Sequence, residues 1–136
     1  MKTRFLFPNE TEKVIDWLMA WRGHPMEARD AERLFVPRDW TLGVFSEDGR
    51  LLAGGAIYPT IQGDLGFMGK VISDPEGDRL ENAAALRVLV REMKRELAKT
   101  GAKIAMSLYG EEPMARIAAN GIPATPVFLV LSPTEE

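Results

Sequence analysis

Apolar residues recur along the chain with two different spacings, which predict an ordered mixture of strands and helices. Runs rich in β-branched and aromatic residues predict strands at residues 3–7, 40–45, 51–60, 64–73, 102–110 and 125–132. Apolar residues three and four positions apart predict helices at 8–23, 25–35, between Asp78 and Gly101, and at 111–121. The order β-α-α-β-β-β-α-β-α-β is typical of an α+β fold, and the length fits one domain over residues 1–136.

Turn and cap residues mark the ends of these elements. Asn9 followed three residues later by Glu12 is a capping-box pattern, which predicts the start of the first helix. Asp48-Gly49 lies between two apolar runs and is the strongest short signal for a tight turn. Residues 40–60 are therefore predicted to form a β-hairpin.

The longest predicted helix has one apolar and one charged face. Its expected buried stripe is Leu86, Leu89, Val90, Met93 and Leu97. Its expected exposed basic residues are Arg87, Arg91, Lys94, Arg95 and Lys99. Glu92 and Glu96 alternate with these cations, so the pattern favours a solvated face over a surface for nucleic acid.

Composition excludes several kinds of chemistry. The chain has 136 residues and a net charge of −3, so no overall basic field favours nucleic acid or an anionic membrane. It contains no cysteine, which excludes disulfides and thiolate catalysis, and the single histidine, His24, provides no histidine cluster for a metal. No apolar run reaches the length of a membrane span. We expect no metal, nucleic-acid or membrane partner, and a cytoplasmic location.

The stretch "SDPEGDRLENAAALRVLV" at residues 73–90 holds the main candidate site. The start of a helix offers amides without intrahelical partners and about half a positive charge, which suits a phosphate. The same stretch carries four carboxylates, and Asp78-x-x-Glu81 is a capping box that would use those amides itself. The residues alone leave both interpretations open, a phosphate-binding loop and a helix that caps itself.

The chain resembles the GNAT superfamily of acyl-CoA-dependent N-acetyltransferases, in element order and in two sequence windows. The family's loop pattern is Gln/Arg-x-x-Gly-x-Gly/Ala, and "RLENAA" places Arg79, Asn82 and Ala84 at its three defined positions. Asn82 stands where the family has glycine, so we expect its side chain to occupy part of the diphosphate approach. Near the C-terminus, "ARIAANGIPATPVFLVL" follows the family's shape, with Ile117 where a general-acid tyrosine is frequent.

The resemblance implies a GNAT-like, mostly antiparallel sheet. It implies a long helix after the strand at 64–73, and a parallel, splayed pair formed by that strand and the strand at 102–110. It implies acetyl-CoA or CoA as the cofactor, held by Val71, Ile72, Arg79, Asn82, Ala83 and Ala84. Tyr109, at the end of the strand after the long helix, is the implied catalytic residue, because it would reach the leaving thiolate.

Two functions of different classes remain. One is an N-acyltransferase that moves an acetyl group from acyl-CoA to an amine. The other is a non-catalytic GNAT-like binding or structural protein, for instance a bacteriophage protein within a virion or a component of a homo-oligomer or larger assembly. Asn82, Ile117 and the acidic loop favour the second, whereas the matches at Arg79 and Ala84 favour the first.

Overall fold

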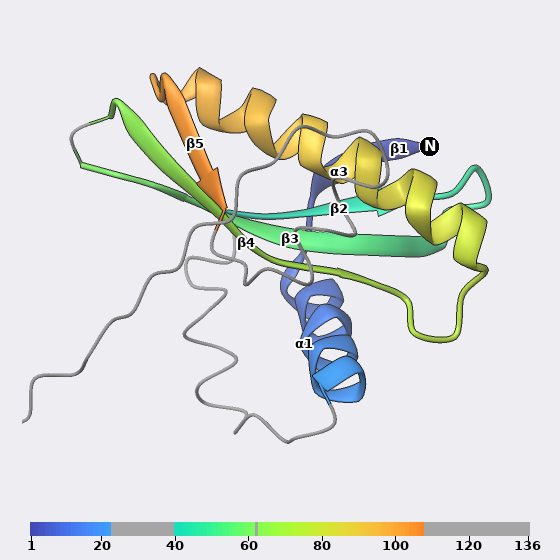
Figure 1. Ribbon diagram of the computed structural model, residues 1–136. Coiled ribbons are helices and arrows are strands. Elements are labelled where there is room, and N and C mark those ends of the chain that lie inside the picture. The colour runs from blue at the N-terminus through green and yellow to red at the C-terminus, as the bar shows by residue number, and fades with distance from the viewer. Residues whose placement is uncertain (23–39, 62, 108–136) are drawn as a thin grey trace, which may run out of the picture.

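The computed structural model describes residues 1–22, 40–61 and 63–107, which form a five-stranded sheet with two helices (Figure 1). The elements in chain order are β1 (Lys2–Phe5), α1 (Pro8–Arg22), β2 (Thr41–Phe45), β3 (Leu51–Pro59), β4 (Leu65–Ser73), α3 (Arg79–Lys99) and β5 (Ile104–Ser107). The predicted α+β class is confirmed. The helices predicted at 25–35 and 111–121 and the strand predicted at 125–132 lie outside the described residues.

The strands lie side by side in the order of the sequence, β1-β2-β3-β4-β5. The first three pairings are antiparallel, whereas β4 and β5 are parallel, with Leu65 opposite Ile104 and Met68 opposite Ser107. A parallel neighbour requires a crossover connection, and α3 provides it. The predicted parallel pair is thus confirmed, while the predicted splay concerns residues beyond 107 and stays a prediction.

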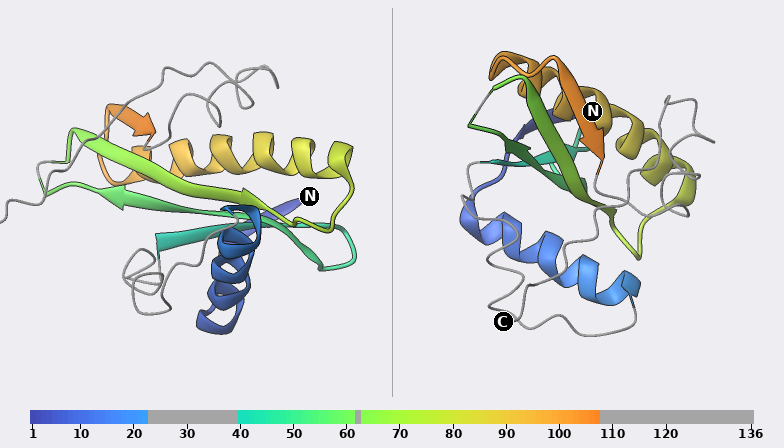
Figure 2. Two further views of the ribbon diagram at one scale, coloured as in Figure 1. Left: turned by 60° about the horizontal axis from the view of Figure 1, so that its bottom comes forward. Right: turned by 60° about the vertical axis from the view of Figure 1, so that its left-hand side comes forward.

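The two helices cover opposite faces of the sheet (Figures 1 and 2). On the α3 face, the buried cluster comprises Leu42, Val44, Leu52, Ala53, Ile57, Met68, Ala85, Leu89, Met93 and Leu97. On the α1 face, it comprises Leu6, Val14, Ile15, Trp17, Phe45, Leu51 and Ala56. The predicted stripe of α3 is confirmed, with Leu86 half-buried at its margin. Each face therefore has its own core, and the sheet is held from both sides.

Strand β4 contains a bulge opposite Gly55. Gly54 is paired with Ile72 and Ala56 with Gly69, so two steps along β3 match three steps along β4. Gly55 also lies close to α3, because a Cβ built on it would be 3.0 Å from the sulfur of Met93. The bulge and the glycine together bring the α3 face of the sheet close to the helix at this point.

The start of α1 differs from the predicted Asn9–Glu12 capping box, which is wrong. The helix begins at Pro8, and the Glu10 carboxylate reaches back to accept from the Phe7 amide at 2.8 Å. Glu10 also accepts two hydrogen bonds from Arg4, at 2.7 and 2.8 Å, and these lower the pKa of its carboxyl. Proline favours the first helical position, and the ion pair with β1 fixes the carboxylate there.

The predicted turns are confirmed where the structure describes them. The amide of Gly49 donates to Ser46, and its φ of 86° lies in the left-handed region that the Asp48-Gly49 turn requires. Gly101, with a φ of 97°, follows the last turn of α3 and donates to Ala98. Glycine at these positions closes the β2–β3 hairpin and ends the long helix.

Tyr58, half-buried on the α1 face, should make stability depend on pH in the alkaline range. Burial raises the pKa of its hydroxyl from 10 to about 12. The contribution of this hydroxyl to folding is fully present below pH 10 and is lost as the pH rises through 12. Between these two pH values the hydroxyl ionises in the unfolded chain but stays protonated in the folded protein. We expect the free energy of unfolding to fall by about 1 kcal/mol more in the wild type than in Tyr58→Phe across that window.

Denaturant titrations at stepped pH measure this difference. Equal falls in the two proteins would contradict the assignment, because the remaining lysines and Tyr109 are common to both.

Candidate functional site

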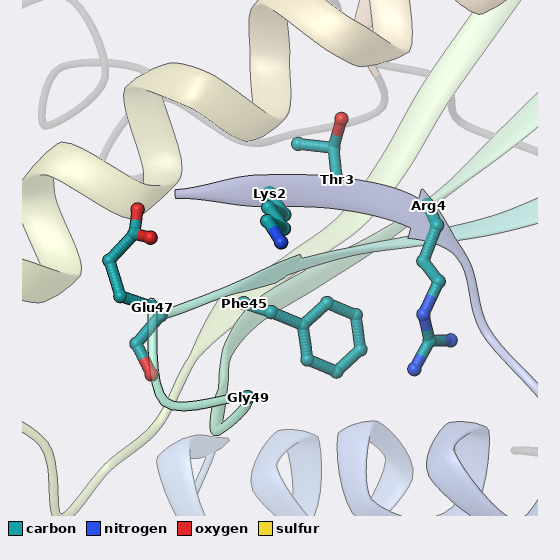
Figure 3. Close-up of a pocket in the computed structure, with 7 residues that line it drawn as sticks. Lys2, Thr3, Arg4, Phe45, Glu47 and Gly49 are labelled. Carbon is teal, nitrogen blue, oxygen red and sulfur yellow. The ribbon is translucent and has the colours of Figure 1, made fainter.

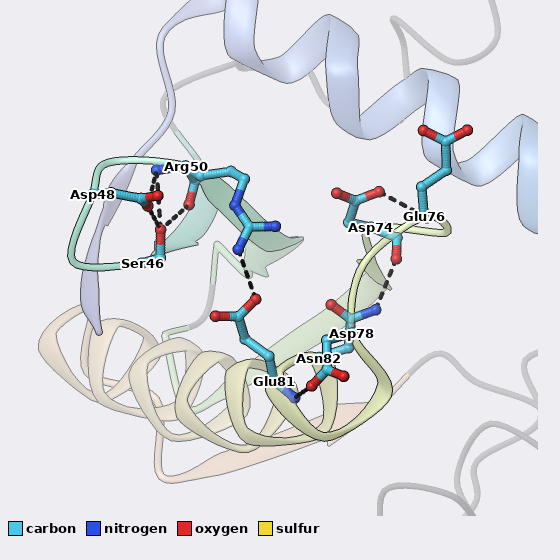
Figure 4. A network of polar contacts seen from close by, with 8 residues as sticks. All are labelled: Ser46, Asp48, Arg50, Asp74, Glu76, Asp78, Glu81 and Asn82. Carbon is cyan, nitrogen blue, oxygen red and sulfur yellow. Dashed lines mark hydrogen bonds and ion pairs between the residues drawn. The ribbon is translucent and has the colours of Figure 1, made fainter.

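The candidate site combines the bulged half of β4, the loop of residues 74–78 and the first turn of α3. Beyond Met68, no described strand pairs with β4 on the side of β5. The chain leaves β4 at Ser73, turns through the loop and enters the helix at Arg79. Figure 4 shows this loop, the start of α3 and the β2–β3 turn, which faces the helix.

Asp74 organises the loop through both its side chain and its carbonyl group. Its carboxylate accepts from the amide of Glu76 at 2.9 Å. Its carbonyl oxygen accepts from the amide of Gly77 at 3.1 Å and from Nδ2 of Asn82 at 2.7 Å. These bonds fold the loop into a tight turn that is tied to the first turn of α3.

Asp78 caps the helix. Its backbone is extended, with φ −67° and ψ 133°, and its carboxylate accepts from the amide of Glu81 at 2.9 Å. The reciprocal half of the predicted capping box is replaced, because the Glu81 carboxylate pairs with the Arg50 guanidinium at 2.8 Å instead (Figure 4). The self-capping interpretation is therefore right for Asp78, whereas Glu81 joins α3 to the β2–β3 turn.

The side chain of Asn82 lies inside the loop of residues 74–78. Its side chain is buried, 8% exposed, and points into the loop, where Nδ2 donates to Asp74. A Cβ on Gly77 would be only 2.8 Å from the Asn82 Oδ1 atom, which itself has no hydrogen-bond partner. The Asn82 amide therefore fastens the loop from inside, and the expectation that its side chain occupies part of a diphosphate approach stays a prediction.

The other predicted cofactor-binding residues lie in two groups on either side of the loop. Val71 is half-buried in the bulge against the α3-side core, and Ile72 is half-buried against the α1-side core. Arg79 and Ala84 are exposed on α3, and Ala83 is half-buried. Tyr109, the predicted catalytic residue, lies outside the described residues.

Few amides remain for a ligand at the start of α3. The amides of Glu76, Gly77 and Glu81 all donate within the loop and cap. Within the described ranges, the amides of Arg79 and Leu80 donate to no acceptor. The Leu80 side chain beside them is 82% exposed. These two amides are what the helix start offers to an anion.

The local charge is unfavourable to an anion. Asp74, Glu76, Asp78 and Glu81 surround the helix start, and the nearby cations are Arg79 and Arg50. Arg50 is already paired with Glu81. Two like charges about 4 Å apart repel by about 1 kcal/mol in water and by about 4 kcal/mol at an effective dielectric constant of 20. Carboxylates therefore outnumber unpaired cations around this helix start.

Sequence reasoning missed the role of Arg50, since nothing in its turn sequence indicates a partner on a helix 31 residues away. It also missed a pocket of about 300 Å³ beside β1 and the β2–β3 turn (Figure 3). This pocket is lined by Lys2, Thr3, Arg4, Phe45, Ser46, Glu47 and Gly49. The Arg4 guanidinium lies 4.2 Å from the centre of the Phe45 ring. It is paired with the Glu10 carboxylate, which neutralises its charge toward a ligand in the pocket.

Residues 1–22, 40–61 and 63–107 contain no group of three or more acidic or histidine side chains arranged to hold a metal ion. Over the same ranges, neither helix is long and apolar enough to cross a membrane.

Comparison with known proteins identifies the fold. No protein-family model and no curated protein sequence matches the chain. Rv2747 from Mycobacterium tuberculosis, solved with CoA, is 16% identical, with a TM-score of 0.69 over 93% of this chain and 76% of that one. A putative acetyltransferase from Agrobacterium tumefaciens is 11% identical, with a TM-score of 0.68 over 98% of this chain and 100% of that one.

A third solved structure, glucosamine-6-phosphate N-acetyltransferase from Arabidopsis thaliana, is 13% identical, with a TM-score of 0.61 over 96% of this chain and 97% of that one. All three resemble the chain in their folds rather than in their sequences. The chain therefore has the fold of the GNAT acetyltransferases, as the element order predicts.

Proposed function

We propose that the protein is an N-acyltransferase that passes an acyl group from a CoA-type thioester to an amine. The observation that carries the proposal is the bulge in β4, opposite Gly55 and just beyond the parallel pairing with β5. A bulge turns backbone groups away from the strand ladder, where an extended ligand can use them. The similar fold of Rv2747, which was solved with CoA, supports a CoA-type donor.

The residues of this chain fit the thioester arm of such a donor and do not fit its diphosphate. Residues 69–72 of β4 include Gly69 and the bulge, and no described strand covers their edge. Val71 and Ile72 are proposed to hold the arm through their backbone. The start of α3, by contrast, is capped by Asp78 and surrounded by carboxylates. No step of the proposed reaction depends on a diphosphate at that place.

In the proposed reaction, the neutral amine attacks the thioester carbonyl, a C–N bond forms, and the C–S bond breaks to release a thiol. The amine must first lose a proton, and β4 carries no carboxylate to receive it. Tyr58 is no base at neutral pH, since burial raises the pKa of its hydroxyl to about 12. We therefore assign the proton to solvent water.

Tyr109 is proposed as the acid that protonates the departing thiolate, and the proton that the attacking nitrogen loses as the amide forms restores the tyrosine hydroxyl. Its support is the direction of β5, which is parallel to β4 and is paired at Ser107 with Met68, just before the bulge. A tyrosine hydroxyl is a suitable donor to a thiolate at neutral pH.

Release of free thiol from an acyl thioester, measured with a panel of amines, tests the proposal. We expect release that depends on the amine, and a loss of about 100-fold in kcat for Tyr109→Phe. Tyr58→Phe is the matched control and should keep the wild-type rate. Amine-independent release, or none with any amine, would contradict the proposed reaction.

One observation favours the second candidate, a non-catalytic GNAT-like binding protein. Asp78 stabilises the free helix start without a ligand, as expected of a fold retained for assembly or binding. If neither thioester binding nor turnover is detected, this candidate replaces the first.

A further inference from the structure

We propose that the start of α3 in this chain rejects a diphosphate, and that the acyl donor is recognised only by its acyl-pantetheine arm. This inference rests on the proposed acyltransferase function and names its donor class. The donor is an acyl-pantetheine thioester, to which the nucleotide part of CoA adds no affinity. Free acyl-pantetheine and the pantetheine arm of a carrier share this chemistry.

The first support is the use of the amides. A diphosphate is held at a helix start by several backbone amides that converge on it. Here Asp78 holds the amide of Glu81, and Asp74 holds those of Glu76 and Gly77. Within the described residues only the amides of Arg79 and Leu80 lack an acceptor at the helix start, so a diphosphate that needs more than these two would have to displace carboxylate and carbonyl acceptors that are already in place.

The second support is charge. The carboxylates of Asp74, Glu76 and Asp78 stand on the loop itself. The Arg50 guanidinium, which comes from the β2–β3 turn and would attract an anion, is 2.8 Å from the Glu81 carboxylate. Arg79 is then the one cation of the loop and helix start, within the described residues, that is not held in an ion pair. The local field opposes an anion even though the helix dipole favours one.

The third support is that the loop is fastened and cannot easily be remodelled by a ligand. Asn82 is buried and donates to the Asp74 carbonyl oxygen at 2.7 Å, from one turn inside the helix. Gly77 packs directly on the Asn82 amide, where even a Cβ would be too close at 2.8 Å. Opening the loop would break this bond and expose the buried amide, so the capped state is the one a donor meets.

The arm side of the site lacks the carboxylates of the helix start. The bulged residues of β4, residues 69–72, carry no acidic side chain. An uncharged pantetheine amide requires only backbone partners of the kind that a strand edge provides. Donor recognition is therefore assigned to β4 and not to α3.

The experiment compares acetyl-CoA with acetyl-pantetheine by calorimetry and by kcat/KM for thiol release. We expect the two donors to agree within about three-fold in both quantities. A preference for acetyl-CoA above about ten-fold would overturn the inference while leaving the proposed function intact. If neither donor binds or reacts, both the donor assignment and the proposed function are overturned.

Charge variants make the test specific to α3. Asp78→Asn keeps a capping side chain and removes one negative charge, and we expect it to tighten acetyl-CoA about five-fold while leaving acetyl-pantetheine unchanged. Glu96→Gln, near the other end of the same helix, is the matched control and should change neither. Equal tightening of both donors by Asp78→Asn, or an equal effect of Glu96→Gln, would overturn the assignment to the helix start.

Discussion

Replacing Leu97 with alanine is expected to lower the free energy of unfolding by about 2 to 5 kcal/mol. Leu97 is 1% exposed and belongs to the core between α3 and the sheet. Its side chain lies directly over Gly66 of β4, where a Cβ would be 2.5 Å from the Leu97 Cδ2 atom. The truncation leaves a cavity between α3 and β4. Urea denaturation measures the resulting loss in the free energy of unfolding.

The same contact provides an internal control. Gly66→Ala alone should destabilise the protein, since the new methyl group collides with Leu97. In the double variant the methyl group enters the space that Leu97→Ala vacates. We expect the double variant to be more stable than the sum of the two single changes predicts, by about 0.5 to 3 kcal/mol. Strict additivity would show that α3 does not pack on β4 at this point.

The second large effect is expected at the cap of α3. Asp78→Ala should lower the free energy of unfolding by about 0.5 to 2 kcal/mol, because the Glu81 amide loses its acceptor. Asp78→Asn should cost much less, since asparagine caps helices nearly as well as aspartate does. Thermal unfolding of the two variants separates the loss of the hydrogen bond from the loss of charge.

A different order of stabilities would assign another role to Asp78. If Asp78→Asn were as unstable as Asp78→Ala, the charge of Asp78 and not its hydrogen bond would stabilise the helix start. If both variants were as stable as the wild type, the cap would be unimportant, and the helix start would be free to accept a ligand at little cost.

The patterns that repeat along the sequence predicted most of the fold. The helical spacing of Leu89, Met93 and Leu97 predicted the buried face of α3, and the structure places all three in one core. Asp48-Gly49 predicted the hairpin turn. The resemblance to GNAT proteins predicted that β4 and β5 are parallel, which strand spacing alone does not determine. The helical spacing and the turn are set by residues close together in the sequence, and the strand order recurs in a known family, so both can be predicted from one sequence.

The candidate site was predicted less well, because its geometry depends on contacts between distant residues. The capping box at Asp78 is a local pattern, and its Asp78 half is right. The Glu81 carboxylate pairs with Arg50 and does not complete the capping box. At the start of α1, Glu10 takes the place predicted for Glu12, because Arg4 pairs with Glu10. The inward turn of Asn82 depends on the path of the loop, and no residue pattern indicates it.

The most direct test of the central claim is the position of a bound acyl thioester, determined from a crystal soaked with acetyl-pantetheine or acetyl-CoA. We expect the arm to lie along residues 69–72 of β4, beside the bulge opposite Gly55. We also expect Asp78 still to cap the Glu81 amide in that complex. A thioester bound elsewhere, such as in the pocket beside Arg4 and Phe45, or a diphosphate seated on α3 in place of the Asp78 carboxylate, would contradict the central claim.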